Sequence, residues 1–401
     1  MILGKEGKAN GRRRVAVTGV GCITPIGIGA EGFWAGLRSY ESAVRRVTRF
    51  DPEQFRSHMA AEVNDFDPLD HLEAKRIKRL DRFGQFSVAT ARLALDDAGL
   101  DPSSLEPARV AVQMGSALGG VAYGEAQHQV FVEHGPQSVS PMLALAVFVG
   151  ASSCNIAIEF GFTGPNATNG MSCASGAIGI GHAFRLIRGG EADVALAGGA
   201  ECPLSPLSYG AFALIRAMSK RNDDPQTASR PFDIDRDGFV MGEGAAILVL
   251  EEWGRAQRRD ARIYAELCGF GTTNDGFHMT APRPDGSESA RAIELALADA
   301  RALPAEVEYV NAHASSTKLN DPAETRAIKA SLGERAYRVP VSGTKGYYAH
   351  PLGASGAIEA AICALAIQRG WLPPTLNLTK ADPECDLDYV NGEGREVSVG
   401  Y

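Results

Sequence analysis

The pentapeptide ASGAI stands at residues 174–178, inside SCASGAIGIGHAF (172–184), and recurs at residues 354–358, inside LGASGAIEAAICA (352–364). Each copy follows a short glycine-bearing segment and opens a stretch whose apolar residues have helical spacing. A chain with 45 glycines can repeat an Ala/Gly-rich pentamer by chance. Because both copies fall at the same point in a repeating order of strands and helices, they indicate two related halves.

Short β-branched runs alternate with longer Ala/Leu-rich amphipathic stretches in the first part of the chain. This alternation is typical of an α/β protein with buried sheets. We expect strands at residues 13–21, 109–117, 192–201 and 242–251, and helices at residues 83–100 and from Cys173 to about Arg188.

The same order starts again near residue 262. We expect strands at residues 262–271 and 307–317, then the segment 338–350 leading into a helix at residues 351–370. The chain is therefore predicted to divide into residues 1–261, which carry longer insertions (notably 201–240), and residues 262–401.

Composition narrows the class of protein. Hydrophobic residues make up 45% and charged residues 22%, and the formal net charge of −8 disfavours nucleic-acid binding as the main activity. The polar N-terminal segment lacks the apolar core of a signal peptide, and no run of ~18 apolar residues predicts a membrane span. The seven cysteines show neither a C-x-x-C pair nor metal-ligand spacing. We expect a cytoplasmic, reduced protein without a metal site, membrane insertion or nucleic-acid partner.

Cys173 is the candidate nucleophile, because it lies just before a predicted helix among small residues. The positive end of a helix dipole favours the reactive thiolate, and small neighbours let a carbonyl group approach. The backbone N–H of Cys173 is a candidate donor to an oxyanion. The alternative is a buried structural thiol, which is the commoner fate of a lone cysteine.

Two of the eight histidines lie where α/β folds place reactive groups. His313 ends a predicted strand, and His350 precedes the second ASGAI helix, near Lys345 and Glu359. If the halves pack about a pseudo-twofold axis, these positions converge with Cys173. The alternatives are hydrogen-bonded structural histidines and a structural Lys–Glu ion pair.

A nucleotide site is only weakly indicated. Gly19 and Gly21 match the first two glycines of G-x-G-x-x-G, but Thr24 stands at the third position, and the sequence contains no Walker A motif.

A set of motifs covering nearly the whole chain resembles the β-ketoacyl-acyl-carrier-protein synthases of the ketoacyl synthase II type. These motifs are VAVTGVGCITPIG (15–27), GSALGG (115–120), GPNATNGMSCASGA (164–177), AGGAE (197–201), the segment 216–245 ending in GFVMGEGA, CGFGTTNDGFHMTAP (268–282), NAHASSTKLND (311–321) and GTKGYYAHPLGASGAIEA (343–360). The resemblance implies an α/β thiolase fold, in which two duplicated halves form a five-layer α-β-α-β-α arrangement.

The resemblance also implies the reaction. Cys173 would take an acyl group from acyl carrier protein, and His313 and His350 would assist the decarboxylation of malonyl-carrier-protein. The enolate would attack the acyl-cysteine and give a 3-ketoacyl-carrier-protein, as in fatty-acid or related polyketide synthesis. Lys345 and Glu359 would support the histidines. No cofactor is expected on this chain, because the phosphopantetheine arm arrives on the carrier protein.

Further expectations concern the substrate pocket and the partners. The resemblance places Leu118 and Phe212 in the acyl pocket and implies a homodimer. It also implies a basic docking surface for the acidic carrier protein. The candidate docking residues are Lys75, Arg76, Lys78, Arg79, Arg216, Lys220 and Arg221, with Arg82 nearby. Without the resemblance, these residues would be interpreted as part of solvent-exposed helix faces.

The chain departs from the family pattern at three places. Ala314 and Ala349 stand where glycine is common, which adds a methyl group beside each histidine. The chain ends at REVSVGY (395–401), where the family continues with a glycine-rich loop and a last strand. The loop would supply a second oxyanion donor, so its loss would cost ~10²–10³ in rate. We expect the sequence to be a clipped record of a longer protein.

Two other functions compete with a condensing enzyme. One is a noncatalytic partner of a ketosynthase, like a chain-length factor, but such partners lack the cysteine that stands at 173. The other is a thiolase or hydrolase acting on coenzyme A thioesters. Thiolases use a second cysteine as base, whereas this sequence offers two histidines.

Overall fold

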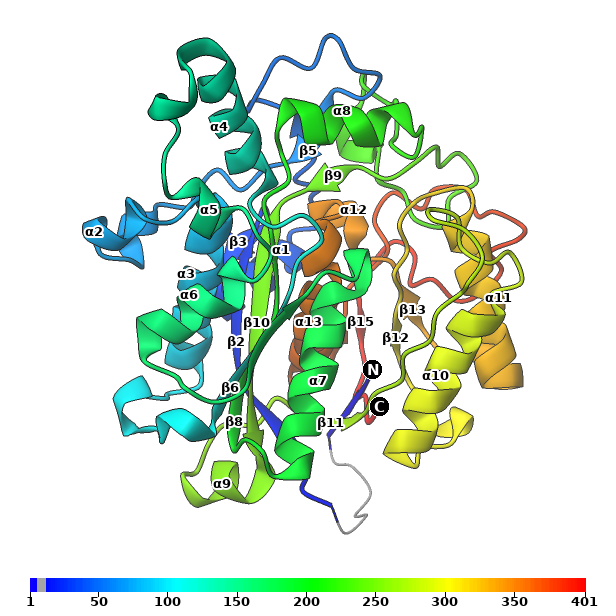
Figure 1. The fold of residues 1–401 in the computed structure, drawn as a ribbon. Helices are drawn as coiled ribbons and strands as arrows, with labels where there is room; N and C mark the ends of the chain where they lie inside the picture. Colours follow the sequence, from blue (N-terminus) through cyan, green and yellow to red (C-terminus); the bar gives the residue numbers. More distant parts are fainter. Residues whose placement is uncertain (6–11) are drawn as a thin grey trace.

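The computed structural model describes residues 1–5 and 12–401 as a mixed α/β fold built on one large sheet (Figure 1). The strand order is β1-β11-β2-β10-β8-β6-β7, and β3 pairs with β2. The bounds are β1 Ile2–Gly4, β2 Val15–Thr24, β3 Gly27–Ile28, β6 Val110–Gly115, β7 Asn166–Asn169, β8 Val194–Glu201, β10 Gly244–Glu252 and β11 Ala265–Gly269. Short strands form three smaller sheets: β4 Arg45–Arg46, β5 Met59–Ala61 and β9 Met241–Gly242; β12 Val310–Asn311 and β13 Val341–Ser342; β14 Trp371–Leu372 and β15 Arg395–Glu396.

Helices cover both faces of the large sheet, which explains why its central strands are continuous apolar runs. On one face Ile180 and Phe184 pack with Ala361 in one core cluster, and on the other Val88 and Leu95 pack in another. The helices are α1 Gly29–Arg38, α2 Ala74–Ile77, α3 Arg82–Asp97, α4 Val121–His134, α5 Leu143–Ala146, α6 Ala151–Phe160, α7 Ser175–Gly189, α8 Pro206–Leu214, α9 Trp253–Arg258, α10 Ser287–Ala300, α11 Asn320–Leu332, α12 Lys345–Tyr348 and α13 Ser355–Arg369.

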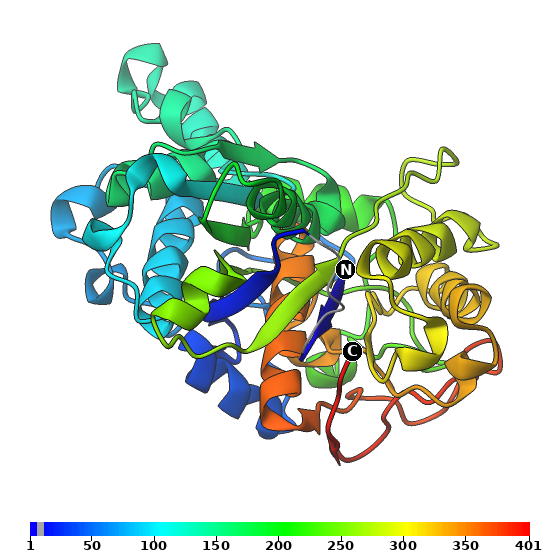
Figure 2. The ribbon, with the colours of Figure 1, turned by 90° about the horizontal axis from the view of Figure 1, so that it is seen from below.

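The two ASGAI segments meet in space. A Cβ atom on Gly176 of α7 would lie 2.9 Å from the backbone nitrogen of Ala357 on α13. Reciprocally, a Cβ atom on Gly356 would lie 2.8 Å from the Cβ of Ala177. Each glycine thus lets the other helix approach, and α7 and α13 pack at their N-terminal turns. Figure 2 shows α13 in orange beside the strands β1, β2 and β11, which it contacts.

Most predicted elements are confirmed within a few residues, but the strand expected at 307–317 is much shorter in the structure. It consists of Val310 and Asn311, which pair with β13, and the amide of Ala312 adds one hydrogen bond to the carbonyl of Ser342 (2.9 Å). The positive φ angles of Ala314 (45°) and Ser316 (65°) break the strand geometry immediately afterwards. Strand β11, from the second part of the sequence, joins the large sheet beside β2. The division into two halves at residue 261 stays a prediction.

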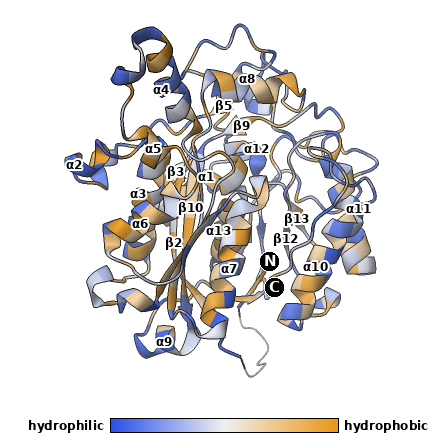
Figure 3. Cartoon of the chain, viewed as in Figure 1, coloured by the Kyte–Doolittle hydropathy of each residue, from blue (hydrophilic) through white to orange (hydrophobic). Residues whose placement is uncertain are grey.

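Hydropathy follows this architecture. In Figure 3 the strands β2 and β10 are coloured mainly as hydrophobic, whereas α10 and α9 carry hydrophilic residues toward the outside. Among the residues described, none of the helices has both the length and the apolar character needed to cross a bilayer.

Candidate active site

Cys173 lies in a 3-10 turn, Ser172–Ala174, immediately before α7. Ser172 has φ 46°, an uncommon backbone conformation for a residue with a side chain. Backbone strain of this kind often occurs at functional sites. The turn places Cys173 at the N-terminal end of the helix, the position that the sequence predicted, and leaves it half-buried.

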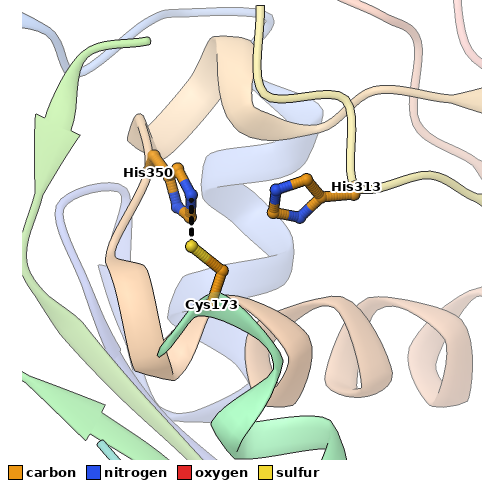
Figure 4. A group of neighbouring side chains, drawn as sticks. All are labelled: Cys173, His313 and His350. Atoms are coloured by element: carbon orange, nitrogen blue, oxygen red, sulfur yellow. Dashed lines mark hydrogen bonds between the residues drawn. The ribbon is translucent and has the colours of Figure 1, made fainter. Parts of the chain in front are cut away.

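The structure brings Cys173, His313 and His350 together (Figure 4). The Sγ of Cys173 is 3.1 Å from Nε2 of His350. The two imidazole rings have centroids 5.1 Å apart and are inclined by 79°. One candidate ligand atom from each of the three side chains lies within 4.8 Å of the others. Residues far apart in sequence therefore form one compact reactive group.

The position of His350 is fixed by its backbone and its ring. Its amide donates to the carbonyl of Val240 (2.9 Å), and its carbonyl accepts from the amide of Gly242 (3.1 Å). The ring Nδ1 is 2.8 Å from Oγ of Ser355, and the ring lies edge-on to Phe239 with centroids 5.4 Å apart. With Nδ1 held by a neighbour, Nε2 is the nitrogen directed at the thiol.

His313 is held by two charged side chains. Its amide donates to Glu324 Oε1 (2.6 Å), and its carbonyl accepts from Lys345 Nζ (2.5 Å). Lys345 Nζ also lies 3.4 Å from Nδ1 of His313 and forms an ion pair with Glu359. Because an ammonium group can only donate, Nδ1 accepts, and the proton of a neutral His313 ring lies on Nε2.

Burial controls protonation here. The pKa of the Cys173 thiol is raised to about 11, because desolvation by burial outweighs the opposing effect of the nearby Lys345 ammonium group. Burial also holds the pKa of His313 and of His350 well below the usual value, and Lys345 adds to this effect. The resting site therefore holds a thiol and two neutral imidazoles at neutral pH. Desolvation thus opposes the thiolate that the helix end is expected to favour.

The residue types Cys, His and His also occur as zinc ligands. The ammonium group of Lys345, 3.4 Å from His313 Nδ1, opposes a cation at this place. Two neutral imidazoles beside a thiol instead suit acyl transfer, in which one ring accepts a proton and both can donate to an oxyanion.

Two carboxylates that the sequence analysis did not single out organise the site: Glu201, which is buried, and Glu324, which is half-buried. Glu201, the last residue of β8, accepts from the amides of Ala117 (2.6 Å), Leu118 (3.1 Å) and Gly353 (2.9 Å). The pKa of Glu201 is raised to about 7, because desolvation by burial outweighs the opposing effect of these hydrogen bonds. Glu324 holds the loop of His313 in the same way. A single acidic residue at the end of an apolar strand, as in AGGAE, was the available signal for Glu201.

The candidate pocket residues lie beside the nucleophile. Leu118 and Phe212 are half-buried and pack in one apolar cluster with Cys173, Phe239 and Leu352. The ring of Phe212 meets that of Phe239 edge-on, with centroids 6.0 Å apart. An apolar surface therefore adjoins the thiol.

The candidate docking residues fall into two groups. Figure 1 places α2, with Lys75 and Arg76, at one margin of the molecule and α8, which precedes Arg216, at the top. Arg76 forms an ion pair with Glu159, so its charge is already matched. Five of the candidates are exposed: Lys75, Lys78, Arg79, Arg216 and Lys220. Arg82 is engaged by Glu243, and Arg221 is half-buried and donates to the carbonyl of Asp235 (3.3 Å).

Comparison with family models gives two adjacent matches. Residues 12–256 match the model "Beta-ketoacyl synthase, N-terminal domain", and residues 264–379 match "Beta-ketoacyl synthase, C-terminal domain". The first match contains Cys173, and the second contains His313 and His350.

Similar proteins span almost the same length. The chain is 45% identical over 388 residues to a 3-oxoacyl-[acyl-carrier-protein] synthase 2 of Synechocystis sp., covering 97% of this chain and 93% of the relative. It is 47% identical over 385 residues to a "Putative polyketide beta-ketoacyl synthase 1" of Streptomyces cyaneus, covering 94% and 91%. A solved structure of a type II polyketide ketosynthase in complex with its acyl-carrier protein matches with a TM-score of 0.88 at 34% identity, covering 96% of this chain and 94% of that one.

Proposed function

The chain belongs to the β-ketoacyl synthase family, and from this premise we propose that it is a 3-oxoacyl-acyl-carrier-protein synthase with Cys173 as nucleophile. The observation that carries the proposal is the contact of 3.1 Å between Cys173 Sγ and His350 Nε2, with His313 beside them. A thiol within reach of an imidazole is the arrangement that covalent acyl transfer needs.

In the first half-reaction, His350 Nε2 takes the proton of Cys173 as the sulfur attacks the thioester carbonyl of an acyl-carrier-protein. The bond between that carbonyl carbon and the pantetheine sulfur breaks, and this sulfur leaves with the proton from Nε2. The acyl group remains on Cys173, next to the apolar cluster with Leu118 and Phe212, which supports their assignment as acyl-pocket residues.

In the second half-reaction, the bond between the malonyl carboxylate and the α-carbon breaks, and CO₂ leaves. The electron pair becomes an enolate whose oxygen accepts hydrogen bonds from Nε2–H of His313 and His350. The enolate carbon then attacks the acyl-cysteine carbonyl, the Cys173 C–S bond breaks, and the released sulfur takes a proton from His350 Nε2 to restore the thiol. The product is a 3-oxoacyl-carrier-protein that is longer by two carbons. Lys345, with Glu359, keeps the His313 ring in the donor tautomer.

The finer architecture and the partners belong to the same proposal. The packing of α7 against α13 at their repeated segments supports a duplicated, five-layer thiolase arrangement with halves at 1–261 and 262–401. The relative solved with an acyl-carrier protein supports such a partner. The similarity to a 3-oxoacyl-[acyl-carrier-protein] synthase 2 supports a cytoplasmic place of action. Exposed Arg216 and Lys220 are the candidate docking charges beside α8.

A homodimer is supported by the edge of the large sheet. Strand β7 ends the strand order, so one side of its backbone has no neighbouring strand in the described sheet. Met171, just after β7, and Ile158, on α6, are large apolar side chains exposed by 62% and 67%. Helix α6 contacts β7. An unpaired strand flanked by exposed apolar residues fits pairing with a second copy.

Intact-protein mass spectrometry tests the central claim. After mixing with acyl-carrier-protein, the wild type is expected to gain the mass of the acyl group, and Cys173→Ala is expected to gain none. His313→Ala and His350→Ala are expected to impair decarboxylation of malonyl-carrier-protein more than self-acylation. A folded wild-type protein that gains no acyl mass would contradict the enzyme assignment and favour a noncatalytic partner of a ketosynthase.

A further inference from the structure

Ser355 lies behind His350, on the side of the ring opposite the thiol. Its Oγ is 2.8 Å from His350 Nδ1, while His350 Nε2 is 3.1 Å from Cys173 Sγ. Ser355 is fully buried and His350 is 4% exposed. A hydroxyl, an imidazole and a thiol therefore form one continuous chain of hydrogen bonds, shielded from solvent at its inner end.

The repeated pentapeptide provides an internal comparison. Ser175 occupies the same place in the first copy, but its Oγ donates to the backbone carbonyl of Ser172 (2.7 Å). Each serine is the first residue of its helix, and the preceding alanines, Ala174 and Ala354, make no side-chain cap. The contact of the Ser355 hydroxyl with an imidazole is thus not a feature that the helix start requires.

We propose that Ser355 is a positioning residue that accepts from Nδ1–H of His350 and so keeps Nε2 directed at Cys173 in both half-reactions; this inference rests on the proposed condensing function. A hydroxyl group can both donate and accept. When His350 takes the thiol proton at Nε2, its Nδ1–H donates to Ser355 Oγ. When His350 donates from Nε2–H to the enolate oxygen, its Nδ1–H still donates to Ser355 Oγ, so the ring keeps its orientation.

The protons balance across the cycle. In acylation the S–H bond of Cys173 breaks and an Nε2–H bond forms, and this proton then leaves with the pantetheine sulfur. His350 is then neutral, with its proton on Nδ1. Before decarboxylation, Nε2 takes a proton from water that enters on the thiol side as the carrier arms exchange, and Nδ1 keeps its own. When the Cys173 C–S bond breaks, the released sulfur takes the Nε2 proton, which restores the thiol and the neutral ring; Ser355 keeps its proton throughout.

The Ser355 hydroxyl carries no charge, and this affects the protonation of His350. A carboxylate at this place could only accept, so it would hold the proton on Nδ1 and stabilise an imidazolium ion. A hydroxyl accepts from Nδ1–H without adding charge, so Nε2 can give up its proton readily to the Cys173 sulfur. This agrees with the low pKa that burial and Lys345 impose on His350.

The test compares Ser355→Ala, Ser355→Thr and the control Ser331→Ala with the wild type. Ser331 is a buried helical serine on α11 that donates to the carbonyl of Ala327 (2.9 Å), outside the site. Three properties are measured: thermal unfolding, the rates of self-acylation and of malonyl-carrier-protein decarboxylation, and the pH profile of Cys173 alkylation by iodoacetamide. Alkylation is followed peptide by peptide, because Cys154 is exposed and would react as well.

Ser355→Ala is expected to lower kcat of both half-reactions by about 10–100-fold with KM nearly unchanged, a typical loss for a partner that orients a reactive imidazole. Its alkylation profile should move to higher pH, because an imidazolium with an unpaired Nδ1–H stabilises the thiolate less. Ser355→Thr keeps the hydroxyl and should remain within about threefold of the wild type, as should Ser331→Ala.

Three results would overturn the inference. One is wild-type rates and a wild-type alkylation profile in Ser355→Ala. Another is an equal loss of activity in Ser331→Ala at equal thermal stability. A third is a folded Ser355→Thr as impaired as Ser355→Ala. A wild type that fails to self-acylate would instead contradict the proposed function, and the alkylation profiles would still report on the contact between Ser355 and His350.

Discussion

At the scale of single residues, the backbone beside each reactive histidine is strained. Ala314 and Ala349, which adjoin His313 and His350, have φ angles of 45° and 60°. Only glycine adopts such angles without a steric penalty. The sequence analysis treated these alanines as a small added methyl group, whereas the structure locates their main effect in the backbone. The surrounding hydrogen bonds must hold this strain in place.

Replacing either alanine by glycine is therefore expected to stabilise the protein. For Ala314→Gly and Ala349→Gly we expect the free energy of unfolding to rise by up to about 1 kcal/mol, after subtraction of the extra entropy of unfolded glycine. Urea denaturation measures this change. Ala298→Gly, at an exposed position of α10, is the control and should cost about 0.5–1 kcal/mol. Destabilisation of both site variants would contradict the strain argument.

The resting thiol makes a second residue-scale prediction. Because burial raises the pKa of Cys173 to about 11, the thiolate fraction should grow about tenfold per pH unit between pH 7 and 10. Iodoacetamide should alkylate Cys173 faster in the same proportion when substrate is absent. Mass spectrometry of the Cys173 peptide at several pH values measures this dependence. A plateau already reached at pH 7 would show a preformed thiolate–imidazolium pair instead.

At the scale of elements, hydrophobic periodicity was sufficient to predict the long helices and the buried strands. The helix expected at residues 83–100 corresponds to α3, Arg82–Asp97, and the strand expected at 192–201 corresponds to β8, Val194–Glu201. Periodicity failed at β12, where positive φ angles end the strand after Asn311. It also gave no sign of the roles of Ser355 and Glu201, because these depend on side-chain and backbone contacts that periodicity does not report.

The close crossing of α7 and α13 predicts a contrast between two glycines of one helix. A Cβ atom at Gly176 would lie 2.9 Å from backbone of α13, whereas at Gly189 the nearest atom is the mobile end of Glu191, 3.7 Å away. Gly176→Ala should destabilise the protein by about 1–3 kcal/mol and displace Cys173 from His350, lowering the acylation rate. Gly189→Ala should be neutral or slightly stabilising. Equal melting temperatures and rates for the two variants would contradict this account of the crossing.

At the scale of the whole molecule, the exposed edge at β7 predicts self-association. Ile158→Glu places a charge in the apolar surface beside β7 and should weaken a dimer at least about tenfold, because burying an unpaired charge is costly. Sedimentation velocity over a range of concentrations measures the dissociation constant. Leu303→Glu, at a site exposed by 62% in the second part of the chain, is the control. A monomeric wild type, or equal weakening by both variants, would rule out this edge as the interface.

The separation of Cys173 from His350 by 177 positions also has a consequence for how the protein is synthesised. At a translation rate of about 5–20 residues per second, the ribosome takes roughly 10–35 s to add the imidazole after the thiol. The delay between the synthesis of β2 and that of β10, its neighbour in the sheet, is longer still. A nascent chain therefore carries an unactivated thiol, and acyl loading begins only when translation has passed both family-matched segments. An interrupted polypeptide would not consume the cell's acyl donors.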